Sequence, residues 1–393
     1  MKTLALLLAA FPVALAVYAY ALYPAALRLL AALRPAPPRP PEPDELPSVS
    51  ICLPVHDEAA QVRGALDSLL ALDYPNDRLQ LLVVSDASTD GTDDIVREYA
   101  DRGIELLRIP TRGGKTAAEN AATEHLRGDI VLNTDASVRP HPASLRALAR
   151  HFADPTVGVA SGRDVSVAAD AECANATETG YVGYEMAIRA METRLGGIVG
   201  ASGCLYAIRA HLHRAPFPQH LSRDFASALI AREHGFHSVS VDDALCVVPR
   251  TSSLRREYYR KVRTISRGME TLVYKRALLS VPRYGGFAVR LWSHKVCRWA
   301  VPPAALPGAA GLALLAPSTP LAAAALVLGA IAVALAAVGW MWPEERPMPR
   351  VVAMAAFAVA GNAAVLHALV RLVRGADDHI WEPTRRAVLP TAH

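Results

Sequence analysis

The chain has 393 residues, of which 52% are hydrophobic and 20% are charged, and its formal net charge is +4. The Lys and Arg residues are scattered rather than interleaved with aromatic side chains, so the sequence gives little support to nucleic-acid binding. The five cysteines lie apart and form no C-x-x-C pair. This spacing argues against a zinc site and favours reduced thiols in the cytosol.

Apolar residues collect at the two ends of the chain. Residues 3–33 are apolar except for Arg28, and the segment 300–373 is dominated by Ala, Leu and Val. Both stretches exceed the length that a membrane span needs. We therefore expect an N-terminal transmembrane helix over residues 1–34 and transmembrane helices over 300–375. The proline-broken part of the second stretch is the one least expected to cross fully.

The charges that follow the first apolar stretch predict its orientation. Arg28, Arg34 and Arg39 lie at its end, which places the N-terminus outside and the next domain in the cytosol. A cleaved signal peptide ending near Ala16 is the alternative interpretation. We predict that a proline-rich linker (35–47) and a soluble domain (48–275) follow. After them we expect an interfacial amphipathic segment (276–299), the C-terminal helices (300–375) and a tail (376–393).

Buried strands alternate with helices in the first half of the soluble domain. Residues 48–55, 79–84 and 129–135 are predicted strands, and the uninterrupted apolar run Leu81 to Val84 is typical of a strand buried on both faces. Residues 61–72 carry apolar side chains at helical spacing, and 93–99 form a second helix that Thr89 or Asp90 would cap. This alternation predicts an α/β fold with a mostly parallel sheet.

Acidic residues follow two of these strands. Asp86 lies where open α/β sheets bind ligands, so it could hold a nucleotide base or ribose, whereas the acids after it are better explained as helix caps. Asp135 ends another strand two residues before Ser137, an arrangement that suits a divalent cation shared with phosphates or, equally, a simple turn. The Gly113–Thr116 stretch fails the Walker pattern because Ile109 replaces the required glycine.

The order of these motifs resembles that of the family 2 inverting glycosyltransferases with the GT-A fold. The similar segments are Pro54-Val55-His56-Asp57-Glu58, Ser85 to Thr92, Gly114-Lys115 with Asn120, Asp135-Ala136-Ser137, Gly200 to Cys204 with Tyr206 to Arg209, and Ser222-Arg223-Asp224-Phe225. Each segment alone is a weak signal, and their order makes the resemblance specific.

The resemblance implies a role for each matching position. Asp224 would be the general base that takes the acceptor proton, although a helix N-terminal acid would also explain it. Asp135 and Ser137 would hold Mg²⁺ or Mn²⁺. Acceptor-side residues would be Gly203, Cys204 and Arg223. The donor would be bound by Pro54, Val55, Glu58, Asp86, Lys115, Asp135 and Arg263.

The chain departs from the family pattern at three places. Ser137 stands at the second acid of the D-x-D site, and Arg223 stands where Glu is common before the base. The segment Arg260 to Thr264 lacks the tryptophan of processive members, so long-chain synthesis is not implied. A cationic cluster surrounds Arg263 and could bind either a diphosphate or anionic lipid. It consists of Arg255, Arg256, Arg260, Lys261, Arg263 and Arg267.

The expected function is that of a membrane-bound glycosyltransferase. It would move a sugar with inversion from a nucleotide-diphosphate donor, expected to be a UDP-sugar, to a lipid-linked or polysaccharide acceptor at the membrane. The expected location is the inner membrane, with several spans and a cytoplasmic catalytic domain. The alternatives are a polyprenyl-phosphate sugar transferase and a catalytically inactive scaffold of the same fold.

Overall fold

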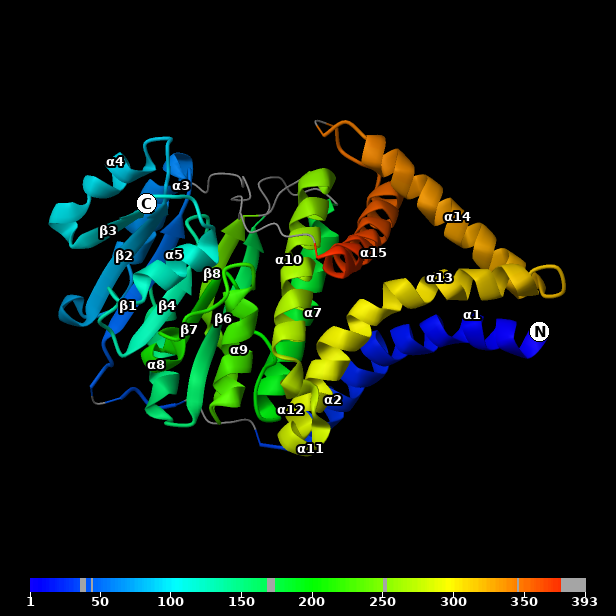
Figure 1. The fold of residues 1–393 in the computed structure, drawn as a ribbon, viewed down its shortest axis with the longest axis horizontal. Coiled ribbons are helices and arrows are strands. Elements are labelled where there is room, and N and C mark those ends of the chain that lie inside the picture. The colour runs from blue at the N-terminus through cyan, green and yellow to red at the C-terminus, as the bar shows by residue number, and fades with distance from the viewer. Residues whose placement is uncertain (36–39, 44, 168–173, 250–252, 345, 376–393) are drawn as a thin grey trace. The chain divides into compact units, whose positions relative to one another are not determined.

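A computed structural model describes the chain except for residues 36–39, 44, 168–173, 250–252, 345 and 376–393 (Figure 1). Its described residues form two compact units. The sheet unit comprises Pro35–Ala169 and Val182–Arg250, and the helical unit comprises Met1–Arg34, Asp170–Tyr181 and Thr251–Ala376.

One eight-stranded sheet organises the sheet unit, in the order β3-β2-β1-β4-β7-β6-β8-β5. The first four strands are parallel to one another, β7 is antiparallel to both of its neighbours, and β8 is parallel to β6. The strands are β1 Val49–Val55, β2 Leu79–Asp86, β3 Ile104–Ile109, β4 Ile130–Thr134, β5 Arg139–Pro140, β6 Val157–Val167, β7 Leu205–Arg209 and β8 His237–Pro249. The predicted mostly parallel sheet is confirmed.

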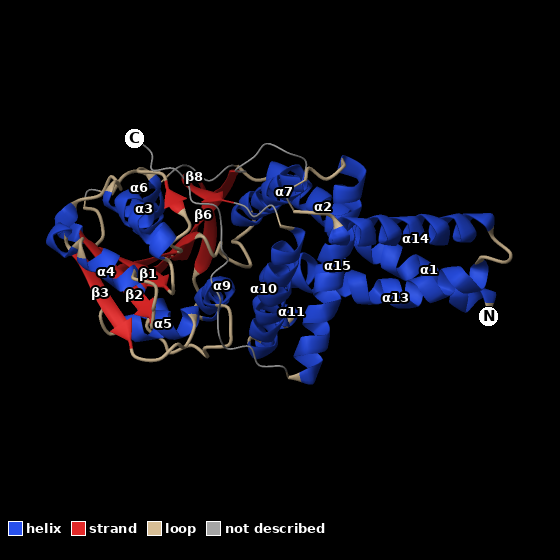
Figure 2. Cartoon of the chain, turned by 90° about the horizontal axis from the view of Figure 1, so that it is seen from above, coloured by secondary structure: helices blue, strands red, loops and turns tan. Residues whose placement is uncertain are grey.

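Helices cover both faces of this sheet (Figure 2). One layer consists of α3 (Ala59–Leu70), α4 (Thr92–Arg97) and α6 (Ser144–Ala149), and the other of α5 (Lys115–Ala122), α8 (Ala210–His213) and α9 (Arg223–Glu233). Along β1, Ile51 and Leu53 pack into the first layer and Cys52 into the second. Because both faces are buried, the central strands are mostly apolar, and the buried Ser50 hydroxyl of β1 donates to Gln80 Oε1 of β2 at 2.6 Å.

The helical unit is built from long apolar helices and one charged helix. Its N-terminal helix runs through α1 (Lys2–Val17), a π-helical turn (Tyr18–Leu22) and α2 (Tyr23–Ala32). The remaining helices are α10 Leu254–Tyr274, α11 Val281–Tyr284, α12 Gly286–Leu291, a π-helical turn Trp292–Val296, α13 Cys297–Leu315, α14 Pro320–Met341 and α15 Arg350–Arg374. Helix α7 (Ala174–Arg194) contributes to both units.

Three of the described helices are long and apolar enough to cross a membrane: Lys2–Ala32, Pro320–Met341 and Arg350–Arg374. Helix α13 is not one of them by composition, yet it is continuous through Pro302, Pro303 and Pro307. It packs closely on α1, where a side chain at Gly311 would meet the backbone of Ala5 and Ala9.

Several boundaries differ from those predicted. Strand β2 continues through Asp86, and the N-cap of α4 is Gly91 (φ 90°) rather than Thr89 or Asp90. Asp90 still serves the first turn, because its Oδ1 accepts the Thr92 backbone N–H at 3.0 Å. Contacts group α10 with the helical unit, where the sequence suggests that the soluble domain continues to residue 275. The apolar face of α10 packs on α15, which explains this grouping.

Candidate active site

Three parallel strands bring their carboxyl ends to one edge of the sheet. Strands β1, β2 and β4 are parallel neighbours that end at Val55, Asp86 and Thr134. Pro54 lies beside Val84 in this ladder, so the ends of β1 and β2 are held in register. The loops that follow these strands therefore meet at the edge where α/β folds bind ligands.

Asp86 anchors the loop that leads into α5. Its two carboxylate oxygens accept the backbone N–H groups of Gly113 and Gly114, each at 2.7 Å, and the residue is 1% exposed. Gly114 adopts φ 88°, a conformation that glycine reaches without strain. Asp86 thus fixes the backbone from which Lys115 projects, and its contact with a nucleotide base stays a prediction.

The loops after β1 and β2 are tied to each other. The backbone N–H of Thr89 donates to Asp57 Oδ1 at 2.7 Å, and that of Glu58 donates to Thr92 Oγ1 at 2.9 Å. Asp57 and Ala87 both adopt positive φ, of 49° and 53°, which is strained for residues with a Cβ. The donor side predicted at Pro54, Val55 and Glu58 is therefore a rigid edge.

Lys115 and Asp135 form the central ion pair of this edge. The Nζ of Lys115 lies 2.6 Å from Asp135 Oδ1, and the two side chains are 16% and 24% exposed. Burial alone lowers the pKa of Lys115, but the carboxylates of Asp135, Glu119 and Asp224 outweigh this and hold the pKa above its ordinary value. Lys115 is therefore a permanent cation at the sheet edge, placed where an anionic ligand can approach.

The donor set around Asp135 suits a loosely held cation. Among the described residues, no three His, Cys, Asp or Glu side chains gather as a metal site. Asp135 offers one partly exposed carboxylate, and Ser137, two residues on, is 7% exposed. Such a set fits a divalent cation that takes its remaining oxygen ligands from phosphates and water.

Asp224 begins α9 and has a defined orientation. Its Oδ1 accepts the Phe225 backbone N–H at 2.7 Å and also the Ser222 hydroxyl. Its Oδ2 faces Gly203 so closely that a Cβ at that position would lie 2.3 Å away. The structure thus places Asp224, the predicted base, beside Gly203, which is predicted to lie on the acceptor side. Cys204 lies next to them, and its carbonyl accepts the Thr134 hydroxyl at 2.9 Å.

Arg223 is a buried brace between α9 and α5. It is 4% exposed, and its Nη1 donates to the His213 carbonyl at 2.8 Å while Nη2 donates to Asn120. Its Nε lies 3.7 Å from Glu119 Oε2. The segment before α9 adds a further tie, because the Asn120 amide donates to the Phe217 carbonyl at 2.7 Å. The brace joins the helix that carries Lys115 to the helix that carries Asp224.

Glu119 and His213 were not found from the sequence. Burial raises the pKa of Glu119, against the opposing effect of Lys115 and Arg223. Burial also holds the pKa of His213 well below its ordinary value, with a further contribution from Arg223. The sequence could have pointed to Glu119 only as an acid on α5 able to pair with the unusual Arg223. That pairing becomes visible only once α5 and α9 are known to be adjacent.

Arg263 lies on α10 in the helical unit, so its role toward a diphosphate stays a prediction. On the same helix, Glu257 pairs with Arg260 at 2.6 Å and with Lys261 at 3.7 Å. Part of the cationic cluster is therefore balanced within α10.

Comparison with known proteins relates most of the sheet unit to a known family. The model of glycosyl transferase family 2 matches residues 50–214. A probable glycosyltransferase, YdaM of Bacillus subtilis, is 37% identical over 101 residues, which are 24% of each chain. An N-acetylglucosaminyltransferase of Rhizobium sp. is 29% identical over 260 residues, 61% of this chain and 57% of that protein. The chain thus spans about a quarter to somewhat more than half of the length of these relatives.

The fold has a solved counterpart over almost its whole length. The mannosyltransferase PcManGT of Pyrobaculum calidifontis, determined with GDP-Man and Mn²⁺, superposes with a TM-score of 0.73 at 24% identity. The match covers 96% of this chain and 99% of that one. Residues 50–214 therefore match the domain model of the family 2 glycosyltransferases, and the chain has the GT-A fold.

Proposed function

We propose that the protein is a membrane-bound inverting glycosyltransferase that moves a sugar from a nucleotide-diphosphate donor to an acceptor at the membrane. One observation carries the proposal most directly. Lys115 is paired to Asp135 at 2.6 Å, and the carboxylate of Asp224 also acts electrostatically on Lys115. The residues that we propose as phosphate-binding cation, metal ligand and base therefore share one electrostatic cluster.

Each of these residues has a step in the proposed transfer. The acceptor hydroxyl attacks the anomeric carbon of the donor and gives its proton to Asp224. The bond between that carbon and the diphosphate oxygen breaks, and the nucleoside diphosphate leaves with the electron pair. Attack from the face opposite the leaving group inverts the anomeric centre.

The leaving diphosphate needs positive charge. Lys115 supplies one fixed cation, and its ammonium donates directly to an oxyanion. A bound Mg²⁺ or Mn²⁺, held by Asp135 with support from Ser137, would supply the rest of the charge stabilisation. With Asp135 holding such a cation, the ammonium of Lys115 would be available to donate to the phosphate.

The donor is proposed by class. Loops 55–59 and 85–92 would hold the base and ribose, with Asp86 ordering the turn beside them. UDP-sugars are our first expectation, and GDP-sugars enter because PcManGT was determined with GDP-Man. The protein would lie in the inner membrane with its sheet unit in the cytosol, where nucleotide sugars are available.

The test is donor turnover by the purified full-length protein in lipid, with a panel of UDP- and GDP-sugars and Mn²⁺ or Mg²⁺. We expect one donor to release its nucleotide, and Asp224→Asn to reduce transfer by about 10²–10⁴-fold while donor binding is retained. Asp243→Asn is the matched control, since Asp243 is a half-exposed acid on β8. A wild-type protein that binds none of these donors, with or without metal, would contradict the proposal.

A further inference from the structure

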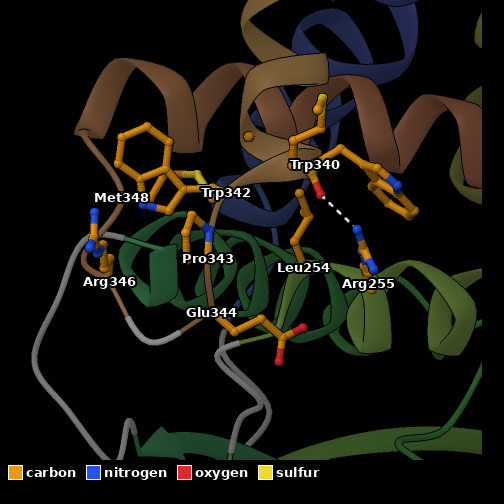
Figure 3. Close-up of a pocket in the computed structure, with 10 residues that line it drawn as sticks. Leu254, Arg255, Trp340, Trp342, Pro343, Glu344, Arg346 and Met348 are labelled. Atoms are coloured by element: carbon orange, nitrogen blue, oxygen red, sulfur yellow. Dashed lines mark hydrogen bonds between the residues drawn. The ribbon is translucent and has the colours of Figure 1, made fainter.

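A pocket of about 330 Å³ lies within the helical unit, where α14 ends and α10 begins (Figure 3). Its walls come from the first residues of α10, the last turn of α14 and the loop that leads to α15. The proposed transfer uses none of these residues. The pocket is therefore a separate feature of the chain.

One wall of the pocket is built in advance around Trp340. The Arg255 guanidinium donates to the Trp340 carbonyl at 3.3 Å and lies 5.7 Å from the centre of its ring. Tyr258 meets the same ring edge-on at 5.4 Å. These contacts hold the indole and the guanidinium in fixed positions, so little side-chain entropy remains to be lost when a ligand binds.

The residues that line the pocket carry more hydrogen-bond donors than their single carboxylate can pair with. The Nε1 of Trp342 is buried and has no hydrogen-bond partner among the described residues. Glu344 is the one acid among the lining residues, and its carboxylate accepts the hydroxyl of Ser253, the N-cap of α10. Two arginines, Arg255 and Arg346, also line the pocket, so its lining has more cationic than anionic side chains (Figure 3). A 21-residue helix also begins there, and helix N-termini favour anions.

The place of the pocket along the chain indicates the source of the anion. Helix α14 is one of the helices long and apolar enough to cross a membrane, and the pocket starts at its last residues. Tryptophan and arginine at the end of a span are typical of the level of the lipid headgroups. Leu254 and Met348 add apolar surface to the same walls.

We infer that this pocket binds the phosphate of a membrane lipid. Arg255, Arg346 and the indole N–H of Trp342 bind the phosphate, and the apolar walls receive the first carbons of its chain. The inference concerns binding and holds whether or not the lipid is the acceptor of the proposed transfer. It assigns a ligand class to a site outside the glycosyltransferase domain.

The test is lipid binding to the full-length protein in detergent, measured by native mass spectrometry. The probes are short-chain phosphatidylglycerol, geranylgeranyl phosphate and a short-chain diacylglycerol without phosphate, with inorganic phosphate as competitor. We expect both phosphorylated lipids to bind and the double variant Arg255→Gln with Arg346→Gln to weaken them at least about tenfold. Trp342→Phe keeps the ring and removes the donor, so a smaller loss of the same kind is expected.

Arg283→Gln is the matched control, because Arg283 also lies over an aromatic ring, 5.3 Å from the centre of Tyr284, and does not line the pocket. Preference for geranylgeranyl phosphate would assign the pocket to an isoprenyl phosphate, and equal binding would assign it to bilayer phospholipid. The inference would be overturned if diacylglycerol bound as tightly as the phosphorylated lipids, if inorganic phosphate did not compete with them, or if a folded double variant bound them unchanged. None of these readouts needs turnover, so they leave the proposed transfer untouched.

Discussion

At the scale of single residues, Gly203 leaves no room for a side chain beside Asp224. A Cβ at position 203 would lie 2.3 Å from Asp224 Oδ2, so Gly203→Ala must displace the carboxylate. A displacement of about 1 Å can cost on the order of 10²-fold in rate, and we expect a loss of that size in transfer by this variant. Sugar transfer with saturating donor is the measurement.

The control for Gly203→Ala is Gly183→Ala. Gly183 lies on α7, and a Cβ added there would have no atom within 4 Å, so alanine at this position changes the helix propensity alone. Nucleotide binding should be the same in both variants. If Gly203→Ala transfers sugar as fast as Gly183→Ala, Asp224 is not the base.

His213 predicts a loss of stability in mild acid. Burial lowers its pKa in the folded protein, whereas the unfolded chain takes up a proton near pH 6.5. Stability is therefore constant above this pH and falls below it, by at most about 1.4 kcal/mol per pH unit. The unfolding midpoint of His213→Gln should fall less steeply between pH 7 and pH 5 than that of the wild type. Exposed His125→Gln should follow the wild type, and parallel curves for all three proteins would refute the assignment.

The positions of site residues were predictable where neighbouring strands bring them together. Asp86 and Asp135 end strands that flank β1, and an edge of parallel strands collects such residues by geometry alone. The brace of Arg223 was not predictable in this way. Its partner Asn120 lies 103 positions away, and their contact depends on how α9 packs on the sheet beside α5. Arg223 looked like a departure from a motif, and the structure gives it a buried acid as partner.

At the scale of elements, α1 and α13 pack through small residues. A Cβ at Gly311 would meet Ala5 O at 2.6 Å and Ala9 N at 2.8 Å, both backbone atoms that cannot yield. Gly311→Ala should therefore lower stability by about 1–3 kcal/mol through overpacking. Gly329→Ala on α14 is the control, because nothing lies within 4 Å of that position. Thermal unfolding in detergent compares the two, and equal midpoints would argue against this helix pair.

The prediction of elements succeeded where periodicity is strong and failed where packing decides. The apolar strands β1, β2 and β4 and the charged helix α10 could be recognised from their patterns. Strand β8 alternates irregularly between buried and exposed positions, so no period marks it. Helix α13 contains three prolines that predict a break, yet it stays helical through all of them while packed along α1.

At the scale of the whole molecule, composition and packing select different helices as membrane spans. By composition α15 qualifies and α13 does not. By packing, α13 follows α1 from the Tyr23–His294 contact to the approach of Gly311 to Ala5, which is about 27 Å of helix and close to the thickness of a bilayer core.

Helix α15 has a polar neighbour instead. It packs along α10, where the Tyr258 hydroxyl and His367 Nδ1 form a hydrogen bond of 3.0 Å and Met269 packs with Val365 and Ala368. Helix α10 carries a row of Arg and Lys residues that hydrocarbon would not accept. We therefore expect three crossings, by α1–α2, α13 and α14, with α15 lying beside α10 on the cytosolic side.

This topology predicts on which side of the membrane two positions lie. An outside N-terminus followed by crossings of α1–α2 and α13 puts Ser318, between α13 and α14, outside, and keeps Arg374, at the end of α15, inside. In intact cells, an impermeant thiol reagent should label Ser318→Cys and should label Arg374→Cys only after permeabilisation, with the native cysteines as background. Four crossings would expose Arg374→Cys from outside and so require α10 to release α15, which its buried contacts oppose. The cluster of arginines at the C-terminal end of α15 favours the same inside location, because positive charge accumulates on the cytoplasmic side of spans.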